Sequence, residues 1–210
     1  RHFPACLKIR REQNYALKMM DTVLMCTTDS YCLLDSDVLF FHPFSGLPTL
    51  LNSSNAVFMQ DRLHGYSLRS WQMLKSPKTP LPSRVNVGLV CFKRALFDLV
   101  QLEWFLAQAH HYGKPFVIEQ AAWAFLGCQV GCQKIDPSQI IVMREHKPVP
   151  TVAGHFTGLT RHLLDEFAST HLKADTETPV ALRTIPCGRC TPLGMLGTEV
   201  AQIFRRITNR

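Results

Sequence analysis

Apolar residues follow two periodicities along the chain. Short apolar runs predict buried strands, whereas apolar residues spaced three and four apart predict the helices that cover them. The runs typical of strands are residues 31–41, 56–60, 84–92 and 140–143. The segments with helical spacing are residues 11–26, 66–75, 95–111, 116–126, 163–172 and 198–207. Strands alternating with helices indicate the α/β class, with a mixed, mainly parallel sheet flanked by helices.

Residues 31–41, with the sequence YCLLDSDVLFF, carry two acidic side chains inside an apolar run. We expect this run to form one buried central strand. Since side chains two apart on a strand share a face, Asp35 and Asp37 would project together. Two buried carboxylates need a cation, and hard oxygen ligands suit Mg²⁺ or Mn²⁺. In the other interpretation, the pair caps the strand end against loop amides or an Arg.

Polar residues also interrupt two other apolar elements. Asn86 and Gly88 share one face at the start of their strand, which fits either a bulge or the close approach of a ligand. Glu119 and Gln120 begin an otherwise apolar helix. They either cap neighbouring backbone or face a polar ligand, because buried polar groups need partners.

His155, Gly158 and Arg161 follow one another at short spacing near the end of the apolar pattern. His155 is either a structural residue or a ligand of an Mn²⁺-type site. The Gly-x-x-Arg spacing can bring a close backbone and a guanidinium onto one phosphate.

Composition indicates one globular domain with an anionic partner. The chain has 210 residues, of which 46% are hydrophobic, enough for a sizeable core. Its net charge of +7 and pI near 9.1 favour anions such as nucleoside diphosphates. The basic residues are scattered, so we expect no nucleic-acid interface.

The last segment, residues 179–210, contains Cys and Pro and ends in an amphipathic helix. Val200, Ile203, Phe204 and Ile207 share one face of this helix. We expect the helix to dock on the body through that face. The alternative is peripheral contact with a membrane, because basic residues occupy the other side.

The eight cysteines allow two interpretations. In one of them, Cys128, Cys132, Cys187 and Cys190 bind a structural zinc ion. We favour the other, in which the thiols are reduced and the protein is cytoplasmic. The remaining four lie singly in apolar patterns, as small buried hydrophobes do: Cys6, Cys26, Cys32 and Cys91.

An acidic pair at a strand end also occurs in phosphatases of the haloacid-dehalogenase type, where the first Asp is the nucleophile. That would make Asp35 the nucleophile of an Mg²⁺-dependent phosphatase. Those enzymes need a small residue after the second Asp and a late acidic pair. Here Val38 follows Asp37, and Asp165 and Glu166 fall within a helical pattern.

Several motifs together resemble the GT-A nucleotide-sugar glycosyltransferases, in particular family 8 and related bacterial enzymes. The resemblance covers about residues 10–172. In chain order the motifs are Lys18 on the first helix, DSD at 35–37, RVNVGLVCF at 84–92, EQAAWAFL at 119–126 and HFTGLTRHLL at 155–164. In the family these correspond to D-x-D, a strand beginning N-x-G, a D/E-Q helix and H-x-x-G-x-x-K/R.

The resemblance implies a metal- and nucleotide-binding role for one group of residues. Asp37 and His155 would bind Mn²⁺ or Mg²⁺, and Asp35 would bridge the metal and the ribose. Arg161, which replaces the commoner Lys, would contact the diphosphate together with Gly158. Lys18 would belong to the same nucleotide-binding set.

A second group is implied on the sugar side. Asn86 would touch the donor sugar or lie beside the reacting carbon, and Glu119 and Gln120 would line the sugar and acceptor side. An inverting enzyme needs a carboxylate base, for which Asp61 and Glu119 are the candidates. A retaining enzyme needs no such base, so both outcomes remain open.

The expected protein is therefore a metal-dependent glycosyltransferase that moves a sugar from a UDP-sugar to an acceptor hydroxyl. Its catalytic domain would span residues 1–178, and its first nucleotide-binding βα unit would be incomplete. The alternatives are the phosphatase, or a truncated, non-catalytic binding module of the same fold.

Overall fold

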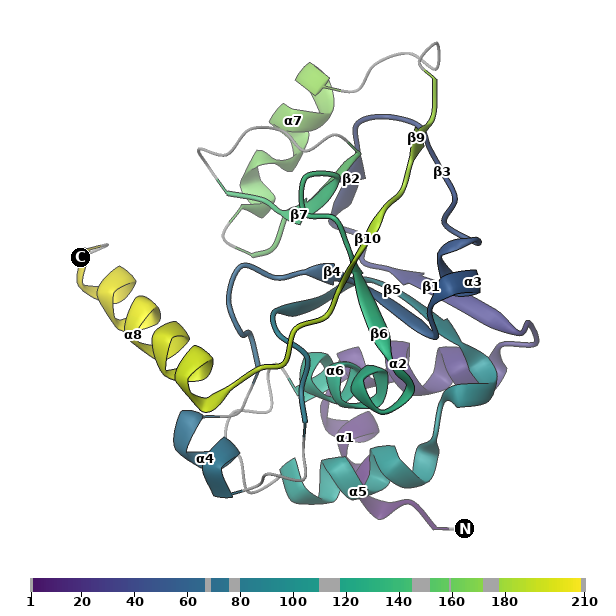
Figure 1. The fold of residues 1–210 in the computed structure, drawn as a ribbon, viewed down its shortest axis with the longest axis vertical. Coiled ribbons are helices and arrows are strands. Elements are labelled where there is room, and N and C mark those ends of the chain that lie inside the picture. The colour runs from purple at the N-terminus through teal and green to yellow at the C-terminus, as the bar shows by residue number, and fades with distance from the viewer. Residues whose placement is uncertain are drawn as a thin grey trace.

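The computed structural model describes residues 2–66, 69–75, 80–109, 118–144, 152–158, 160–171 and 178–208. These residues form a mixed sheet with helices packed around it (Figure 1). The predicted α/β class, with a mixed sheet flanked by helices, is confirmed.

The main sheet runs in the order β1 (Ser30–Leu34), β5 (Val85–Lys93), β4 (Ala56–Gln60), β7 (Ile140–Val142), β8 (Ala153–His155) and β2 (Val38–Phe40). β6 (Cys132–Ile135) also pairs with β4, and β10 (Thr184–Pro186) pairs with β6. A second, two-stranded sheet joins β3 (Phe44–Ser45) to β9 (Val180–Ala181).

Parallel pairs do not dominate the main sheet, so that part of the prediction is wrong. In the described part of the chain, four of its strand pairs are antiparallel and three are parallel. One cause is local to the end of β4. Gln60 pairs with Val85, so the chain returns at the same end of the sheet and β5 runs antiparallel to β4.

The predicted central strand over residues 31–41 is also wrong. The structure divides it into β1 and β2, the first and last strands of the sheet order, joined by a turn. The Val38 N–H donates to the Asp35 carbonyl at 3.2 Å within this turn. Because only three residues connect the two end strands, the sheet curls until both ends meet at Asp35 and Asp37. On one straight strand the two carboxylates would project side by side. The turn instead lets them converge.

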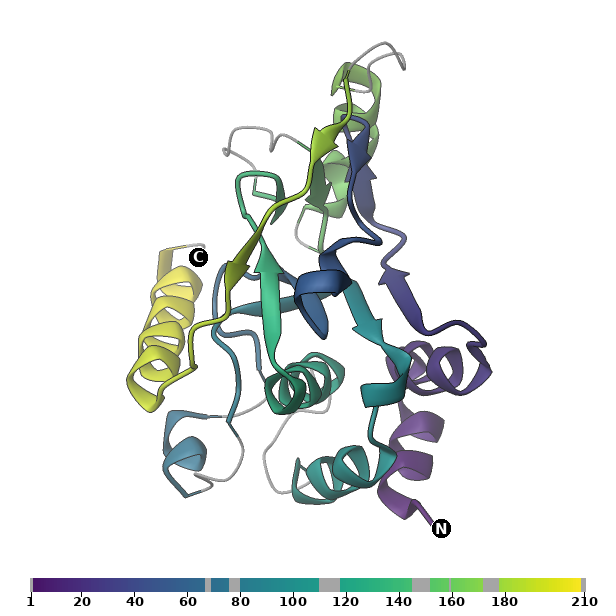
Figure 2. The same ribbon diagram turned by 45° about the vertical axis from the view of Figure 1, so that its right-hand side comes forward.

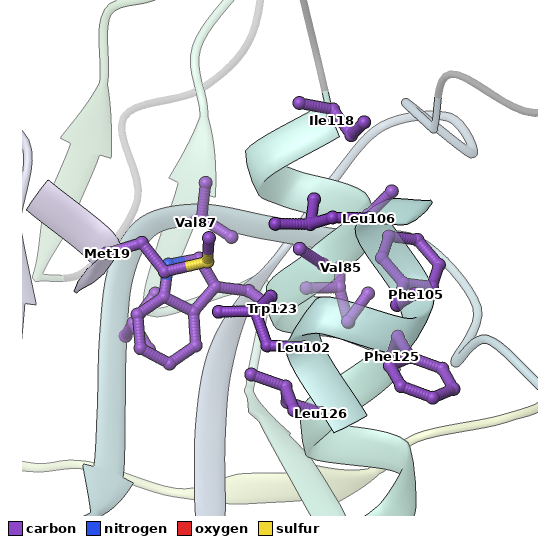
Figure 3. Packing of buried hydrophobic residues seen from close by; sticks show 14 of the residues in the cluster. Met19, Val85, Val87, Leu102, Phe105, Leu106, Ile118, Trp123, Phe125 and Leu126 are labelled. Carbon is purple, nitrogen blue, oxygen red and sulfur yellow. The ribbon is translucent and has the colours of Figure 1, made fainter. Parts of the chain in front are cut away.

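Four helices cover one side of the sheet: α1 (Pro4–Glu12), α2 (Asn14–Met25), α5 (Leu99–Ala109) and α6 (Ile118–Val130). Figures 1 and 2 both show them gathered below the strands. α6 is buried on nearly every side, with Trp123 fully inaccessible. Figure 3 shows Trp123 near Met19 of α2 and Val87 of β5. This core fixes the start of α6, where Glu119 and Gln120 lie, against the strand that carries Asn86.

Two predicted helices have different boundaries in the structure. The helix expected over residues 11–26 is α2. A separate helix, α1, precedes it, and an extended Gln13 lies between the two. The Glu103 carboxylate accepts the N–H groups of Ala5 and Cys6 at 2.8 Å each, which satisfies the first turn of α1. The helix expected over residues 95–111 begins as a 3₁₀ turn at Arg94–Leu96 and becomes α5 at Leu99; residues 110 and 111 lie outside the described part.

The remaining helices are short, except for the last one. They are α3 (Leu50–Ser53), α4 (Ser70–Lys75), α7 (Leu164–His171) and α8 (Pro192–Thr208). α7 packs through Phe167 on Phe41 and Phe156, close to the ends of β2 and β8. Residues 67, 68, 116, 117 and 172 of the predicted helices lie outside the described residues.

The C-terminal helix does not dock through the apolar face that was predicted to contact the body, because Val200, Ile203, Phe204 and Ile207 are exposed. α8 lies beside α4 at the edge of the molecule (Figure 2). Met195 and Thr198 in its first half are buried. By contrast, Ile203 and Ile207 remain 56% and 65% exposed, because the helix extends beyond the body that its first half contacts. None of the described helices has the length and apolar character needed to cross a bilayer.

Candidate metal centre

The β1–β2 turn and the end of β8 bring three ligand atoms together. Asp35, Asp37 and His155 each offer one donor atom, and the three atoms lie within 4.8 Å of one another. Register explains the meeting, because Val38, directly after Asp37, pairs with His155 in the antiparallel ladder. Within the described residues, this is the one group of three or more His, Cys, Asp or Glu side chains arranged in this way.

The zinc interpretation of the cysteines therefore lacks support. The described thiols do not form a cluster of three or more ligand atoms within that distance. The Cys190 thiol lies 4.0 Å from the Met73 sulfur, among apolar neighbours. All eight cysteines are free thiols; Cys6 and Cys91 are buried as predicted, whereas Cys26 is only partly buried and Cys32 is exposed.

Asn86 sets the orientation of the His155 ring. The Asn86 Oδ1 atom accepts the Gly88 N–H at 2.9 Å and lies 3.0 Å from His155 Nδ1. Since an amide oxygen accepts only, Nδ1 carries the proton, and Nε2 is left to face the carboxylates. Second contacts of this kind hold a histidine ligand in the correct tautomer.

Gly88 makes room for the same ring. A Cβ atom on Gly88 would lie 2.3 Å from His155 Nδ1, which no side chain tolerates. The N-x-G pattern therefore has a physical explanation: Asn86 orients the histidine and Gly88 lets it lie against β5. The expected bulge is present as well, because Phe58 pairs with Val90 but Met59 pairs with Asn86, so the β4–β5 ladder is irregular at Gly88.

Asp37 is buried and held by Arg161 and His155. Arg161 Nη2 donates to Asp37 Oδ2 at 2.5 Å, and His155 Nε2 lies 3.0 Å from Oδ1. The contact with His155, followed by that with Arg161, holds the pKa of Asp37 well below its usual range despite burial. Asp37 thus stays ionised and available to a cation.

Asp35 belongs to a second charged group centred on Lys18. Lys18 Nζ donates to Asp35 Oδ1 at 2.5 Å and lies 3.5 Å from Glu119 Oε1. Burial raises the pKa of Glu119 to about 7, and the charge of Asp35 adds to this, although Lys18 opposes both effects. Glu119 therefore exchanges its proton near neutral pH.

These groups line one open cavity of about 470 Å³, a size suited to a small ligand. Eight of the predicted site residues form its wall: Asp35, Asp37, Asn86, Glu119, Gln120, His155, Gly158 and Arg161. A Cβ atom on Gly158 would meet nothing within 4 Å, so the backbone there faces open space. Lys18 lies behind the wall and supports it through Asp35 and Glu119.

Three wall residues were not singled out by sequence reasoning: Tyr15, Val87 and Thr157. Tyr15 lies three residues before Lys18 on α2, and that spacing places both on one helix face. This signal was available in the sequence. Val87 lies next to Asn86 and Thr157 two residues after His155. Their residue types gave no signal that they would line a cavity.

Asp61 is not part of the cavity wall. Its Oδ2 atom accepts Gln120 Nε2 at 3.1 Å and lies 3.5 Å from Asn86 Nδ2, and its Oδ1 accepts the Arg62 N–H at 2.6 Å. The Gln120 amide also donates to the Gly65 carbonyl at 2.9 Å. Asp61 therefore positions Gln120 and Asn86 from behind.

The donor set fits a divalent metal ion. Two carboxylates and an imidazole nitrogen, with waters completing the shell, suit Mn²⁺ or Mg²⁺. Arg161 and Lys18 each pair with one of the two carboxylates, and the Arg161 contact is one that the alternative interpretation of the acidic pair expected. Asp35 and Asp37 converge on one point, as a shared cation requires.

Comparisons with known proteins give one structural likeness. No protein-family model and no curated protein matches the sequence. The crystal structure of mouse xyloside xylosyltransferase 1, in its apo form, is similar to the chain at 13% identity and a TM-score of 0.46. The match covers 70% of this chain and 64% of that chain. Any functional assignment therefore depends on the site itself.

Proposed function

We propose that the protein is a metal-dependent glycosyltransferase of the GT-A type, which transfers a sugar from a UDP-sugar to an acceptor hydroxyl. One observation carries the proposal: Asp35, Asp37 and His155 converge on the wall of a cavity that also holds Arg161 and Glu119. A cation site beside a guanidinium suits a diphosphate, and a carboxylate in the same cavity suits a hydroxyl group.

The metal would be held by Asp37 and His155, with Asp35 placed to reach both the ion and the ribose. When bound, Mn²⁺ or Mg²⁺ supplies Lewis-acid stabilisation of the negative charge that develops on the departing diphosphate. Asn86, bonded to His155 Nδ1, would leave Nε2 available to the ion. Arg161, displaced from Asp37, would turn its guanidinium to the phosphate oxygens beside Gly158.

Glu119 is the better of the two candidate bases. It lines the cavity, is 8% exposed, and has a pKa of about 7, suited to accepting a proton from an acceptor hydroxyl near neutral pH. Both carboxylate oxygens of Asp61 are engaged behind the wall. Gln120, whose amide nitrogen is held by Asp61 and Gly65, would offer its carbonyl oxygen to the sugar and acceptor side.

The geometry does not favour the phosphatase. Asp35, its required nucleophile, follows an antiparallel edge strand and is paired with Lys18 at 2.5 Å. Asp165 and Glu166, the late acidic pair, lie in the first turn of α7 and do not belong to the three-ligand group.

Release of UDP from a panel of UDP-sugars, with and without added Mn²⁺, tests the proposal. We expect at least one UDP-sugar to be consumed in a reaction that a chelator stops and Glu119→Gln slows. Metal-dependent binding without turnover would instead support the non-catalytic binding module. Failure of every UDP-sugar to bind in the presence of Mn²⁺ would contradict the proposal.

A further inference from the structure

Two cysteine thiols face each other across the strand pair β1–β5. Cys32 and Cys91 are direct partners in the antiparallel register, and their sulfur atoms lie 3.3 Å apart. Facing residues in such a ladder have Cα atoms about 4.5–5.5 Å apart, within the range of about 4.4–6.8 Å that disulfides occupy. Side-chain rotation has to bring the sulfurs closer by only about 1.3 Å to reach bonding distance.

The two thiols differ in access. Cys32 lies on the edge strand and is exposed, whereas Cys91 is 1% exposed within an apolar cluster. The Cys91 thiol donates a hydrogen bond to the Cys32 sulfur, which lowers the pKa of Cys32. An accessible thiol with thiolate character beside a second, buried thiol is the arrangement found in oxidisable cysteine pairs.

We propose that Cys32 and Cys91 form a thiol pair that low-molecular-weight disulfides, such as glutathione disulfide, convert to an internal disulfide. The Cys32 thiolate attacks one sulfur of the oxidant, which forms a mixed disulfide and releases one thiol. Cys91 loses its proton and attacks the Cys32 sulfur, which forms the Cys32–Cys91 bond and releases the second thiol. The protein thus loses two protons and two electrons, and the oxidant disulfide is reduced to two thiols.

The bond would stabilise the strand that leads to the metal ligands. β1 pairs with β5 alone among the described strands, and Asp35 follows directly after it. The Asp35 N–H donates to the Gly88 carbonyl at 2.8 Å, which continues the same ladder. Because the disulfide preserves the register, it would hold this edge in place without moving Asp35. The inference does not depend on the proposed function.

Another cysteine pair makes residue-specific mapping necessary. Pro186 pairs with Gln133, so Cys187 comes opposite Cys132 one step further along the ladder. Both of these thiols are partly buried. A change in the total number of thiols would therefore not distinguish the two pairs.

The test treats the whole chain with glutathione disulfide or reduced glutathione and maps linkages by mass spectrometry. We expect a Cys32–Cys91 linkage, and a melting temperature about 5–10 °C above that of the oxidised Cys32→Ser variant. Reduction with dithiothreitol should remove this difference. In Cys91→Ala, Cys32 should keep glutathione as a stable mixed disulfide, because no second thiol displaces it.

Cys26→Ser is the matched control. Cys26 is also a partly accessible thiol with a lowered pKa, but its sulfur bonds to Thr28 rather than to a second thiol. This variant should form the Cys32–Cys91 linkage as the wild type does. A Cys32 that stays free or stably glutathionylated in the wild type would overturn the proposal. Equal melting temperatures for the oxidised wild type and Cys32→Ser would also overturn the proposal. This comparison does not require Cys91→Ala to fold.

Discussion

The Arg161 guanidinium lies 2.5 Å from Asp37 Oδ2, on a carboxylate whose other oxygen faces His155 at 3.0 Å. Without a metal ion, Arg161 supplies the positive charge that the buried Asp37 carboxylate needs. A divalent ion bound by Asp37 would take over that role and leave Arg161 free. The ion and the guanidinium would then be two positive charges in the cavity that could contact a diphosphate.

Arg161→Ala should have opposite effects on two ligands. Binding of Mn²⁺ alone should tighten, because no guanidinium competes for Asp37. Binding of UDP with Mn²⁺ should weaken by about 10- to 100-fold, the usual loss when a charge-assisted contact is removed. Uridine, which has no diphosphate, should be affected much less. Isothermal titration calorimetry with the three ligands measures these effects.

Arg161→Lys should recover part of the UDP affinity, because the charge returns without the two-pronged guanidinium. Arg10→Ala is the control, since Arg10 is an exposed arginine that also pairs with an aspartate, Asp21. Equal losses for UDP and uridine in Arg161→Ala would mean that Arg161 supports the fold rather than the phosphate.

The elevated pKa of Glu119 predicts a pH-dependent stability. The folded protein keeps a proton on Glu119 up to about pH 7, whereas the ordinary pKa is 4.5. Stability from this residue is therefore fully present below pH 4.5 and is lost as the pH rises toward 7. Glu119→Gln stays neutral, so it should gain about 2–3 kcal/mol relative to wild type between about pH 5 and about pH 8.

Urea unfolding of both proteins in the presence of a chelator measures this difference. Glu103→Gln is a useful comparison, because the pKa of Glu103 is lowered from 4.5, so the stability of this variant relative to wild type should stay level between about pH 5 and about pH 8 and should rise only as the pH falls below 4.5. A stability difference between Glu119→Gln and wild type that does not vary with pH would show that Glu119 has an ordinary pKa. The catalytic rate of the wild type should rise through about pH 7, as Glu119 becomes able to accept a proton.

Gly88→Ala tests the positioning of His155. The new Cβ would lie 2.3 Å from His155 Nδ1, so the ring has to move away from Asn86 and the carboxylates. We expect lower stability and a loss of Mn²⁺ affinity of about 10- to 100-fold, as is typical when a histidine ligand loses its orienting contact. Gly158→Ala is the paired control for stability, because its Cβ meets nothing within 4 Å. Equal unfolding midpoints for the two variants would refute the packing argument.

Local patterns predicted the pieces of this site better than their arrangement. The strands at residues 56–60 and 84–92 follow from apolar periodicity. The meeting of Asp35 and Asp37 with His155 was implied only by the resemblance to the GT-A glycosyltransferases. The division of residues 31–41 into two end strands could not be predicted, because a single segment carries no information on its partners. Whether Val38 pairs with β8 depends on residues more than a hundred positions away.

The same limit applies to side-chain partners. Gln120 bonds to Asp61, and Arg161 to Asp37, across 59 and 124 positions of sequence. The contact between Asn86 and His155 could likewise not be predicted from the sequence, although both residues were recognised as polar groups in apolar surroundings. At the C-terminus, the spacing of Ile203 and Ile207 correctly indicated an amphipathic helix. The spacing could not show that the second half of the helix extends past the rest of the protein, which leaves Ile203 and Ile207 exposed.

The central claim is that Asp37 holds the metal on which nucleotide binding depends. Calorimetric titration of UDP into wild type, Asp37→Asn and the partly exposed control Asp21→Asn, each with Mn²⁺ and with a chelator, tests this claim. We expect Mn²⁺ to strengthen UDP binding to wild type and Asp21→Asn but not to Asp37→Asn, with all three proteins folded by circular dichroism. Metal-dependent UDP binding that persists undiminished in Asp37→Asn would contradict it.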